Sequence, residues 1–344
     1  MRIRQRTWAI VLAAGDGTRL ATLTTDANGR SVPKQFCSLT GGRSLLEDAM
    51  QRARRIVPRD RLCAIVAAGH RRYWQPTLWA LPASNVIVQP RNCGTANGIL
   101  LAVLSILERD PLARIVFLPA DHFVRDENAL GGSLREATTL LTRSPDGLAL
   151  VGIEPEEADP ELGYIVPGAA RADGTRCVSR FVEKPDATTA RQLLAGGALW
   201  NSFIFAASGP ALLGMLRERE PHIVDAMTTA IARDARRRDA VSPEVARLRS
   251  RATALEDLYD QLPTIDFSRA VVQGSEARLR VVTAPACGWT DLGTPQRVAE
   301  TLRRLEHERL ERVSRGPRAH LINAPAFVTA PAFINLAAQH ARLG

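Results

Sequence analysis

The chain has 344 residues, of which 45% are hydrophobic and 24% are charged, and its formal net charge is +9. These proportions are those of an ordinary globular protein, and a chain of this length buries a sizeable core without disulfides or metal staples. They exclude a disordered chain, a collagen and a disulfide-rich miniprotein. At roughly 150 residues per domain, the length predicts about two domains, or one large core with an appendage.

The positive charge is spread along the chain rather than gathered in one patch. Short basic clusters, such as residues 236–238 and 303–304, have polar neighbours and are interpreted as solvated surface, so no nucleic-acid partner is expected. The five cysteines are odd in number, far apart and without a CxxC spacing, which predicts neither a disulfide framework nor a zinc site. A reducing cytoplasm fits this pattern.

An apolar run at residues 8–14 follows the basic start of the chain and ends at Gly15. About 20 apolar residues are needed to cross a bilayer, and no small-residue cleavage site follows the run. We therefore expect a buried first strand at residues 8–13, and no membrane partner.

Further apolar runs bounded by turn signals predict strands at residues 62–67, 85–89, 114–118 and 148–153. Apolar residues at three- and four-residue spacing predict helices around 45–56, 99–107 and 134–141. Strands that are almost continuously apolar and alternate with helices favour a parallel sheet covered on both faces.

The pattern changes after Gly152. Strands are predicted at residues 164–166, 177–182, 199–206 and 279–283, and a helical stretch at 211–233 is interrupted by Pro221. Residues 294–313 predict a charged amphipathic helix. The tail, 314–344, is apolar but broken by prolines, and it packs either on the core or on another subunit.

Lysine is rare: the chain has only two lysines, Lys34 and Lys184, against 43 arginines. A compact ammonium fits a tight phosphate pocket where a planar guanidinium does not. We therefore expect both lysines to contact phosphates, with neither in an apolar core. The alternative is that two lysines remain by chance in a chain that otherwise uses arginine.

Residues Gly15-Asp16-Gly17-Thr18-Arg19 follow the first predicted strand. Glycines there let backbone amides approach an anion, and Arg19 supplies positive charge. A dinucleotide-binding turn would need a third glycine at position 19 and an acidic residue about 20 positions further on. Neither is present, and the Gly-Lys-Ser/Thr of a P-loop is absent too.

Two acidic residues stand where strands end, Asp121 in Leu118-Pro119-Ala120-Asp121-His122 and Asp291 in Trp289-Thr290-Asp291-Leu292-Gly293. Ligands of open α/β sheets bind at the carboxyl ends of the strands. Together with the glycine turn, the two lysines and Arg19, the two carboxylates suit a nucleoside triphosphate with Mg²⁺. Helix capping remains the alternative for each acid.

Six motifs in order, VLAAGDGTRL, PKQF, PADHF, FVEKP, WNS and GWTDLGTP, resemble those of the sugar-1-phosphate nucleotidylyltransferases. Among these, the chain is most similar to the bacterial mannose-1-phosphate guanylyltransferases, from about residue 8 to 298. The resemblance implies an α/β, Rossmann-like nucleotidyltransferase fold, with a mostly parallel central sheet flanked by helices and a helical C-terminal extension. It implies a core at 1–293, with a nucleotide-binding half to about 155 and a sugar-phosphate-binding half from about 156. Residues 294–344 then form the C-terminal helix and tail.

The resemblance also implies roles for individual residues. The catalytic set is Arg19, Lys34, Asp121, Lys184 and Asp291, with Mg²⁺ held by Asp121 and Asp291. The residues expected to bind the nucleotide are Ala14, Gly15, Gly17, Thr18, Gln89, Gly94 and Thr95. Those expected to bind the sugar are Gly163, Glu183 and Asn201.

The implied reaction is nucleotidyl transfer from a nucleoside triphosphate, with GTP favoured, to a sugar 1-phosphate, with mannose 1-phosphate favoured. The attacking phosphate oxygen is already ionised, so no general base is needed, and His122 is expected to be structural. The alternatives are a pyrophosphorylase for another sugar and base, or a non-catalytic protein that binds nucleotide sugars. The oligomeric state, including a homodimer, is left open.

Overall fold

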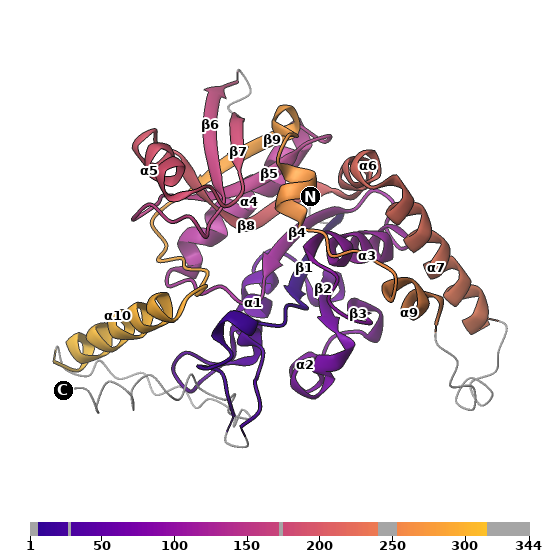
Figure 1. Ribbon diagram of the computed structural model, residues 1–344, viewed down its shortest axis with the longest axis horizontal. Helices are drawn as coiled ribbons and strands as arrows, with labels where there is room; N and C mark the ends of the chain where they lie inside the picture. Colours follow the sequence, from indigo (N-terminus) through magenta and orange to yellow (C-terminus); the bar gives the residue numbers. More distant parts are fainter. Residues whose placement is uncertain (1–5, 27–28, 172–174, 240–252, 315–344) are drawn as a thin grey trace.

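The structure is a computed structural model that describes residues 6–26, 29–171, 175–239 and 253–314 (Figure 1). One nine-stranded sheet runs through these residues in the order β3-β2-β1-β4-β8-β5-β9-β7-β6, with a further pairing of β8 to β6. The strands are β1 (Thr7–Ala13), β2 (Leu62–Ala67), β3 (Val86–Gln89), β4 (Arg114–Pro119), β5 (Leu148–Ile153), β6 (Tyr164–Ala170), β7 (Arg176–Val182), β8 (Leu199–Ser208) and β9 (Leu279–Ala284).

The sheet is mixed, so the expectation of a mostly parallel sheet holds only for its first half. The pairs β1–β2, β2–β3, β1–β4 and β5–β9 are parallel. Strand β8 runs antiparallel between β4 and β5, and the β6–β7 hairpin is antiparallel as well. The prediction failed because β8 is antiparallel although it is as apolar and as buried as a parallel strand. A continuous apolar run reports burial on both faces, which an antiparallel strand inside a mixed sheet shares.

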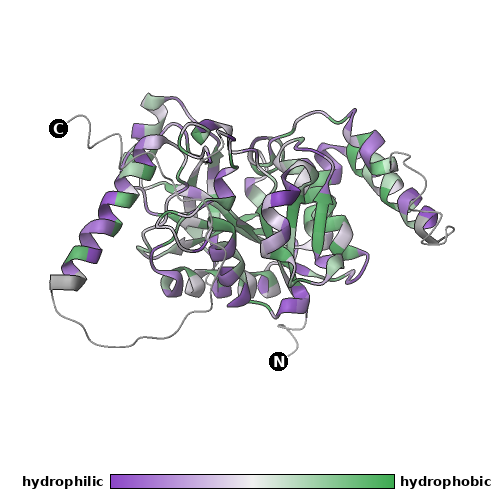
Figure 2. Cartoon of the chain, turned by 90° about the horizontal axis from the view of Figure 1, so that it is seen from below, coloured by the Kyte–Doolittle hydropathy of each residue, from purple (hydrophilic) through white to green (hydrophobic). Residues whose placement is uncertain are grey.

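Helices cover both faces of the sheet. They are α1 (Leu45–Arg54), α2 (Arg71–Leu78), α3 (Thr95–Leu107), α4 (Glu127–Arg143), α5 (Ala187–Ala195), α6 (Gly209–Arg219), α7 (Pro221–Asp239), α9 (Ala254–Tyr259) and α10 (Pro295–Ser314). Apolar residues of α1, α2, α4 and α5 pack in one buried cluster, and those of α3, α6 and α7 pack in the other. Figure 2 shows apolar strands inside the molecule and polar residues on the outer helices.

All nine predicted strands are present, each within a few residues of its predicted limits. The predicted helices are present too, and the interruption at Pro221 separates α6 from α7. Helix α10 begins at Pro295, close to its predicted start. The rest of the predicted tail, 315–344, lies outside the described residues.

Three short helices escaped prediction. Helix α2 contains Pro76, which argues against a helix because proline lacks the backbone N–H. Helix α5 has two β-branched threonines in its first turn, and it starts where it does because the Asp186 side chain accepts a hydrogen bond from the backbone N–H of Thr189. Helix α9 has only six residues, too few for a periodic pattern. No helix among the described residues is long and apolar enough to cross a membrane.

The strand directions bring separate segments to one edge of the sheet. Strands β1, β3 and β4 run parallel and therefore end at this edge. Strand β8 runs against β4, so its first residues lie where β4 ends. Register then places the start of β6 beside the start of β8, because Tyr164 pairs with Trp200. Loops that are far apart in sequence meet here.

Candidate active site

The glycine turn after β1 is held by Gln35. Its side-chain amide donates hydrogen bonds to the carbonyl oxygens of Ala13, at 3.0 Å, and Gly15, at 2.7 Å. Gly17 has a φ of 65°, and a Cβ at that position would lie 2.7 Å from the backbone nitrogen of Lys34. Glycine is therefore required where the turn packs against the segment that carries Lys34.

Lys34 joins the two acidic segments. Its ammonium lies 2.9 Å from Oδ2 of Asp121 and donates a hydrogen bond of 2.6 Å to the carbonyl oxygen of Asp291. Lys34 is 6% exposed, and its ammonium meets polar groups rather than an apolar core. Lys184 is exposed. A buried ammonium needs such partners, because an unpaired buried charge is very costly.

A backbone bridge brings Asp121 and Asp291 to the same place. Phe123 donates a hydrogen bond of 2.9 Å to the carbonyl oxygen of Thr290, and Thr290 donates one of 3.0 Å in return. These two residues follow Asp121 and precede Asp291 along the chain. The expected convergence of the two acids is thus built from main-chain contacts as well as from Lys34.

The acid–base groups of this cluster have displaced pKa values. Burial alone would raise the pKa of Asp121, but Lys34 and His122 hold it below its usual value. Burial raises the pKa of Asp291, although Lys34 opposes the change. Burial lowers the pKa of His122 to about 4, so this imidazole is neutral at pH 7. Asp121 is therefore an anion and His122 a neutral neighbour.

Strand register also gathers the three predicted sugar-binding residues. Tyr164 pairs with Val182 in β7 and with Trp200 in β8, so the residues next to these meet. The backbone N–H of Asn201 donates a hydrogen bond of 2.7 Å to the carbonyl oxygen of Gly163. A Cβ on Gly163 would lie 2.6 Å from Oε2 of Glu183, so a larger residue there would displace that carboxylate.

The predicted nucleotide-binding residues lie around the loop that joins β3 to α3. Gln89 is 1% exposed, and its Oε1 has no hydrogen-bond partner among the described residues. Gly94 has a φ of 86°, and a Cβ there would lie 2.3 Å from the carbonyl oxygen of Ile265. The Thr95 hydroxyl accepts a hydrogen bond of 2.8 Å from the backbone N–H of Phe267. Segment 264–268 is therefore packed closely against this loop.

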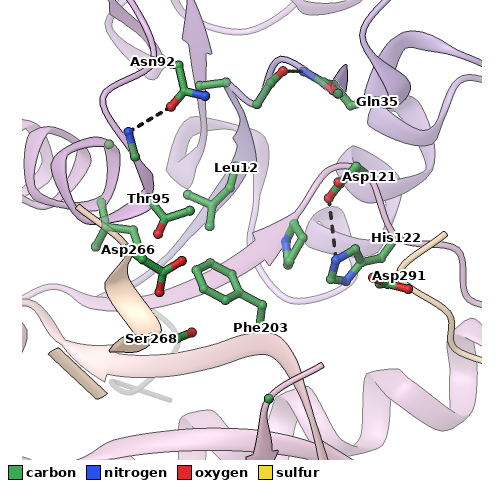
Figure 3. Close-up of a pocket in the computed structure, with 18 of the residues that line it drawn as sticks. Leu12, Gln35, Asn92, Thr95, Asp121, His122, Phe203, Asp266, Ser268 and Asp291 are labelled. Carbon is green, nitrogen blue, oxygen red and sulfur yellow. Dashed lines mark hydrogen bonds and ion pairs between the residues drawn. The ribbon is translucent and has the colours of Figure 1, made fainter. Parts of the chain in front are cut away.

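One cavity of about 390 Å³ opens at this edge of the sheet (Figure 3). It is lined by twelve of the predicted site residues: Ala14, Gly15, Gly17, Arg19, Gln89, Gly94, Thr95, Asp121, Gly163, Glu183, Asn201 and Asp291. Three predicted residues do not line it. They are Thr18, Lys34 and Lys184. Lys34 lies behind the wall, where it contacts the two aspartates.

Several lining residues had no role in the sequence analysis. Gln35 belongs to a recognised motif, yet its contacts with the glycine turn could not be foreseen. Asp266 and Ser268 also line the cavity, and they arrive there because Ile265 exchanges backbone hydrogen bonds with Cys93 and Ala96. Nothing in residues 264–268 resembles a turn or a binding motif, so the sequence held no signal for them.

The backbone is strained at three positions, and all of them border the site. Among the described residues other than glycine, only Lys184, Phe203 and Leu292 have a positive φ, at 47°, 56° and 50°. Lys184 follows Glu183, and Leu292 follows Asp291. Left-handed backbone is costly for side-chain-bearing residues and is concentrated at functional sites. The strain therefore supports the assignment of this cavity as the functional site.

Ion pairs connect the cavity to its surroundings. Arg19 is solvent-exposed and lies 3.6 Å from Glu161, whose loop forms part of the cavity wall. Arg297 of α10 contacts the carboxylates of Asp159 and Asp291. The Asp291 Oδ1 atom also accepts a hydrogen bond from Gly293. Helix α10 therefore contacts one of the two acids directly.

The chain is similar in sequence to known proteins. A profile of the family described as nucleotidyl transferase matches residues 8–308. The mannose-1-phosphate guanylyltransferase of Salmonella muenchen is 29% identical over 292 residues, which are 83% of this chain and 57% of that protein. The xanthan biosynthesis protein XanB of Xanthomonas campestris pv. campestris (strain B100) is 31% identical over 291 residues, with the same shares. The chain thus spans little more than half the length of these curated relatives.

A solved structure is similar over most of its length. The crystal structure described as mannose-1-phosphate geranyltransferase from Thermus thermophilus has 28% sequence identity and a TM-score of 0.66. The similarity covers 84% of this chain and 76% of that one. The chain therefore shares its fold with that protein.

Glu183 yields a prediction about pH. Burial and the nearby Asp266 raise the pKa of Glu183 to about 7, from its ordinary value of 4.5. Between these two values the unfolded chain has lost the proton that the folded chain keeps, so stability falls as pH rises. Glu183→Gln removes this loss. The unfolding free energy of the variant minus that of wild type should therefore rise by more than about 1 kcal/mol from pH 5 to pH 8.

Urea denaturation of both proteins at the two pH values measures this gain. Taking the difference between variant and wild type cancels the other titrating groups. A difference that is the same at pH 5 and pH 8 would show that Glu183 titrates normally.

Proposed function

The chain belongs to the nucleotidyl transferase family, and from that membership we propose that it transfers a nucleotidyl group from a nucleoside triphosphate to a sugar 1-phosphate. Pyrophosphate is the second product. GTP and mannose 1-phosphate are the favoured substrates, because a relative that is 29% identical is named mannose-1-phosphate guanylyltransferase. A cytoplasmic location fits this reaction.

The observation that carries the proposal is the division of one cavity into three chemically different parts. One part has the buried amide of Gln89 and backbone groups, the second has Arg19 and two carboxylates, and the third has the polar side chains of Glu183, Asn201 and Asp266. A nucleoside triphosphate and a sugar 1-phosphate together offer a base, phosphates and a sugar, which is one chemical group for each part. Few other substrates need all three within one cavity.

In the nucleotide part, Gln89 and the loop at Gly94 are proposed to face the base. The unpartnered Oε1 of Gln89 can accept a hydrogen bond from a base N–H. Gly94 lets this loop pack against the backbone of Ile265, because it carries no side chain. An unmatched buried polar group penalises the wrong base strongly, so this part is proposed to set base specificity.

In the phosphate part, the protein mainly positions two anions and reduces their repulsion. Arg19 and the backbone amides of the glycine turn are proposed to bind the triphosphate. The phosphate oxygen of the sugar substrate then attacks the α-phosphorus, a new P–O bond forms, and the bond to pyrophosphate breaks. The attacking oxygen is ionised at neutral pH, so no side chain needs to remove a proton.

In the sugar part, Glu183, Asn201 and Asp266 are proposed to bind the hydroxyl groups. Carboxylates accept hydrogen bonds, and the amide of asparagine both donates and accepts. With a pKa of about 7, Glu183 is partly protonated near neutral pH and can also donate. Lys184 follows directly and is proposed to reach the phosphate of the sugar substrate from the rim.

The two aspartates are proposed to hold Mg²⁺. The described residues contain no cluster of three or more His, Cys, Asp or Glu side chains arranged for a metal. Mg²⁺ commonly uses only one or two carboxylates and completes its shell with substrate phosphates and water. Asp121 and Asp291 on one cavity wall fit that donor set. The bound ion would supply charge neutralisation to the phosphates.

The proposed function is tested by pyrophosphate release. GTP, ATP, CTP and UTP are each incubated with mannose 1-phosphate and with glucose 1-phosphate in the presence of Mg²⁺. We expect the fastest release with GTP and mannose 1-phosphate. Faster release with another pair would assign a different pyrophosphorylase, and tight binding of GDP-mannose without any release would assign a binding protein.

The metal proposal predicts the effect of two isosteric variants. Asp121→Asn and Asp291→Asn each keep the side-chain shape but remove one ligand charge. Each should lower kcat by about 10²-fold or more, the scale of losing one electrostatic stabiliser. Steady-state kinetics at several Mg²⁺ concentrations measure the loss, and thermal melting checks the fold. If Asp291→Asn turned over as fast as wild type, Asp291 would not be a metal ligand, and its role would be limited to binding Arg297 and Gly293.

A further inference from the structure

Strand β8 contains a bulge beside the cavity. Leu150 pairs with Phe205 and Gly152 pairs with Asn201, so three residues of β8 lie opposite the single Val151. The Ser202 hydroxyl fills the gap: it donates a hydrogen bond of 2.6 Å to the carbonyl oxygen of Val151 and accepts one of 3.2 Å from Ile204. Bulges of this kind re-aim a side chain and are frequent next to active sites.

Phe203 stands at the centre of the bulge. Its φ of 56° lies in the left-handed region, which a bulky side chain rarely adopts. Its backbone N–H donates a hydrogen bond of 3.1 Å to Oδ1 of Asn201, which helps to hold this conformation. A phenylalanine kept in a strained conformation by its neighbours suggests that the position of the ring matters.

The Phe203 ring is anchored on one side only. It lies edge-to-face against Phe205, with centroids 6.1 Å apart, and against Phe267, with centroids 6.2 Å apart. These two rings are stacked on each other at 5.1 Å and form a rigid support. Phe203 itself is half-buried, lines the cavity and faces its interior between Leu12 and Asp266 (Figure 3).

Two residues proposed for the sugar part, Asn201 and Asp266, are close to this ring in the chain or through its supports. Asn201 lies two positions before it, and Asp266 and Ser268 flank the Phe267 on which it rests. A pyranose has hydroxyl groups around its rim and C–H groups on its faces. Polar side chains suit the rim, and the electron-rich face of an aromatic ring suits the C–H groups.

We propose that Phe203 is a specificity-determining residue whose ring forms the apolar wall of the sugar subsite and excludes sugar 1-phosphates with a bulky N-acetyl substituent. The inference rests on the proposed function of the same cavity. It goes further, because it assigns the size limit of the sugar subsite to one strained side chain.

The test compares mannose 1-phosphate with N-acetylmannosamine 1-phosphate, which differ only in the group at carbon 2. Phe203→Gly removes the ring and relieves the backbone strain, whereas Phe203→Leu keeps apolar bulk. We expect Phe203→Gly to shift the kcat/KM ratio toward the N-acetyl substrate by about 10-fold or more. Phe203→Leu should shift it much less, and the KM for GTP should stay within about twofold in both variants.

Two kinetic results would overturn the inference. A parallel loss of activity on both sugar phosphates would mean that the ring only supports the segment that carries Asp266. A raised KM for GTP with an unchanged sugar ratio would place the ring against the nucleoside.

Calorimetric titration of the two sugar phosphates separates this inference from the proposed function. A wild-type protein that binds them without turnover contradicts the proposed reaction, but the ratio of Kd values in the variants still tests Phe203. If neither sugar phosphate binds to wild type or to Phe203→Gly, both proposals fail.

Discussion

A single buried ammonium connects the parts of this molecule that matter for its chemistry. Lys34 contacts the carboxylate that follows β4 and the backbone of the segment that follows β9. These segments belong to the two halves of the sheet, which are joined through the antiparallel strand β8. Because an unpaired ammonium in the interior would be costly, Asp121 and the Asp291 segment must stay together. The cavity at the sheet edge depends on that constraint.

Much of the fold could be predicted from local sequence. Each strand is a short apolar run between turn residues, and the parallel strands β1, β2, β3 and β4 follow the expected alternation with helices. Because ligands bind at the carboxyl ends of such strands, the sequence alone predicted that Asp121 and the glycine turn lie at one edge of the sheet. The predicted strands were therefore confirmed.

Other features depend on contacts between distant segments and leave no local pattern. The direction of β8 follows from its pairing with β4 and β5, and its bulge follows from Ser202 bonding to Val151. Asp266 reaches the cavity only through the pairing of Ile265 with the loop after β3. The burial of Lys34 was missed for the same reason, since its partners lie far along the chain. Resemblance to a family supplied residue roles, but not these contacts.

The coupling between Lys34 and Asp121 can be measured by a double-mutant cycle on the rate of pyrophosphate release. If the ammonium acts at the reaction centre through Asp121, Lys34→Met should lower kcat by about 10²-fold. The double variant Lys34→Met/Asp121→Asn should then be little slower than the slower single variant, because residues that act as a unit are not additive. Losses that multiply, or normal turnover of Lys34→Met, would contradict a reaction centre built around this ammonium.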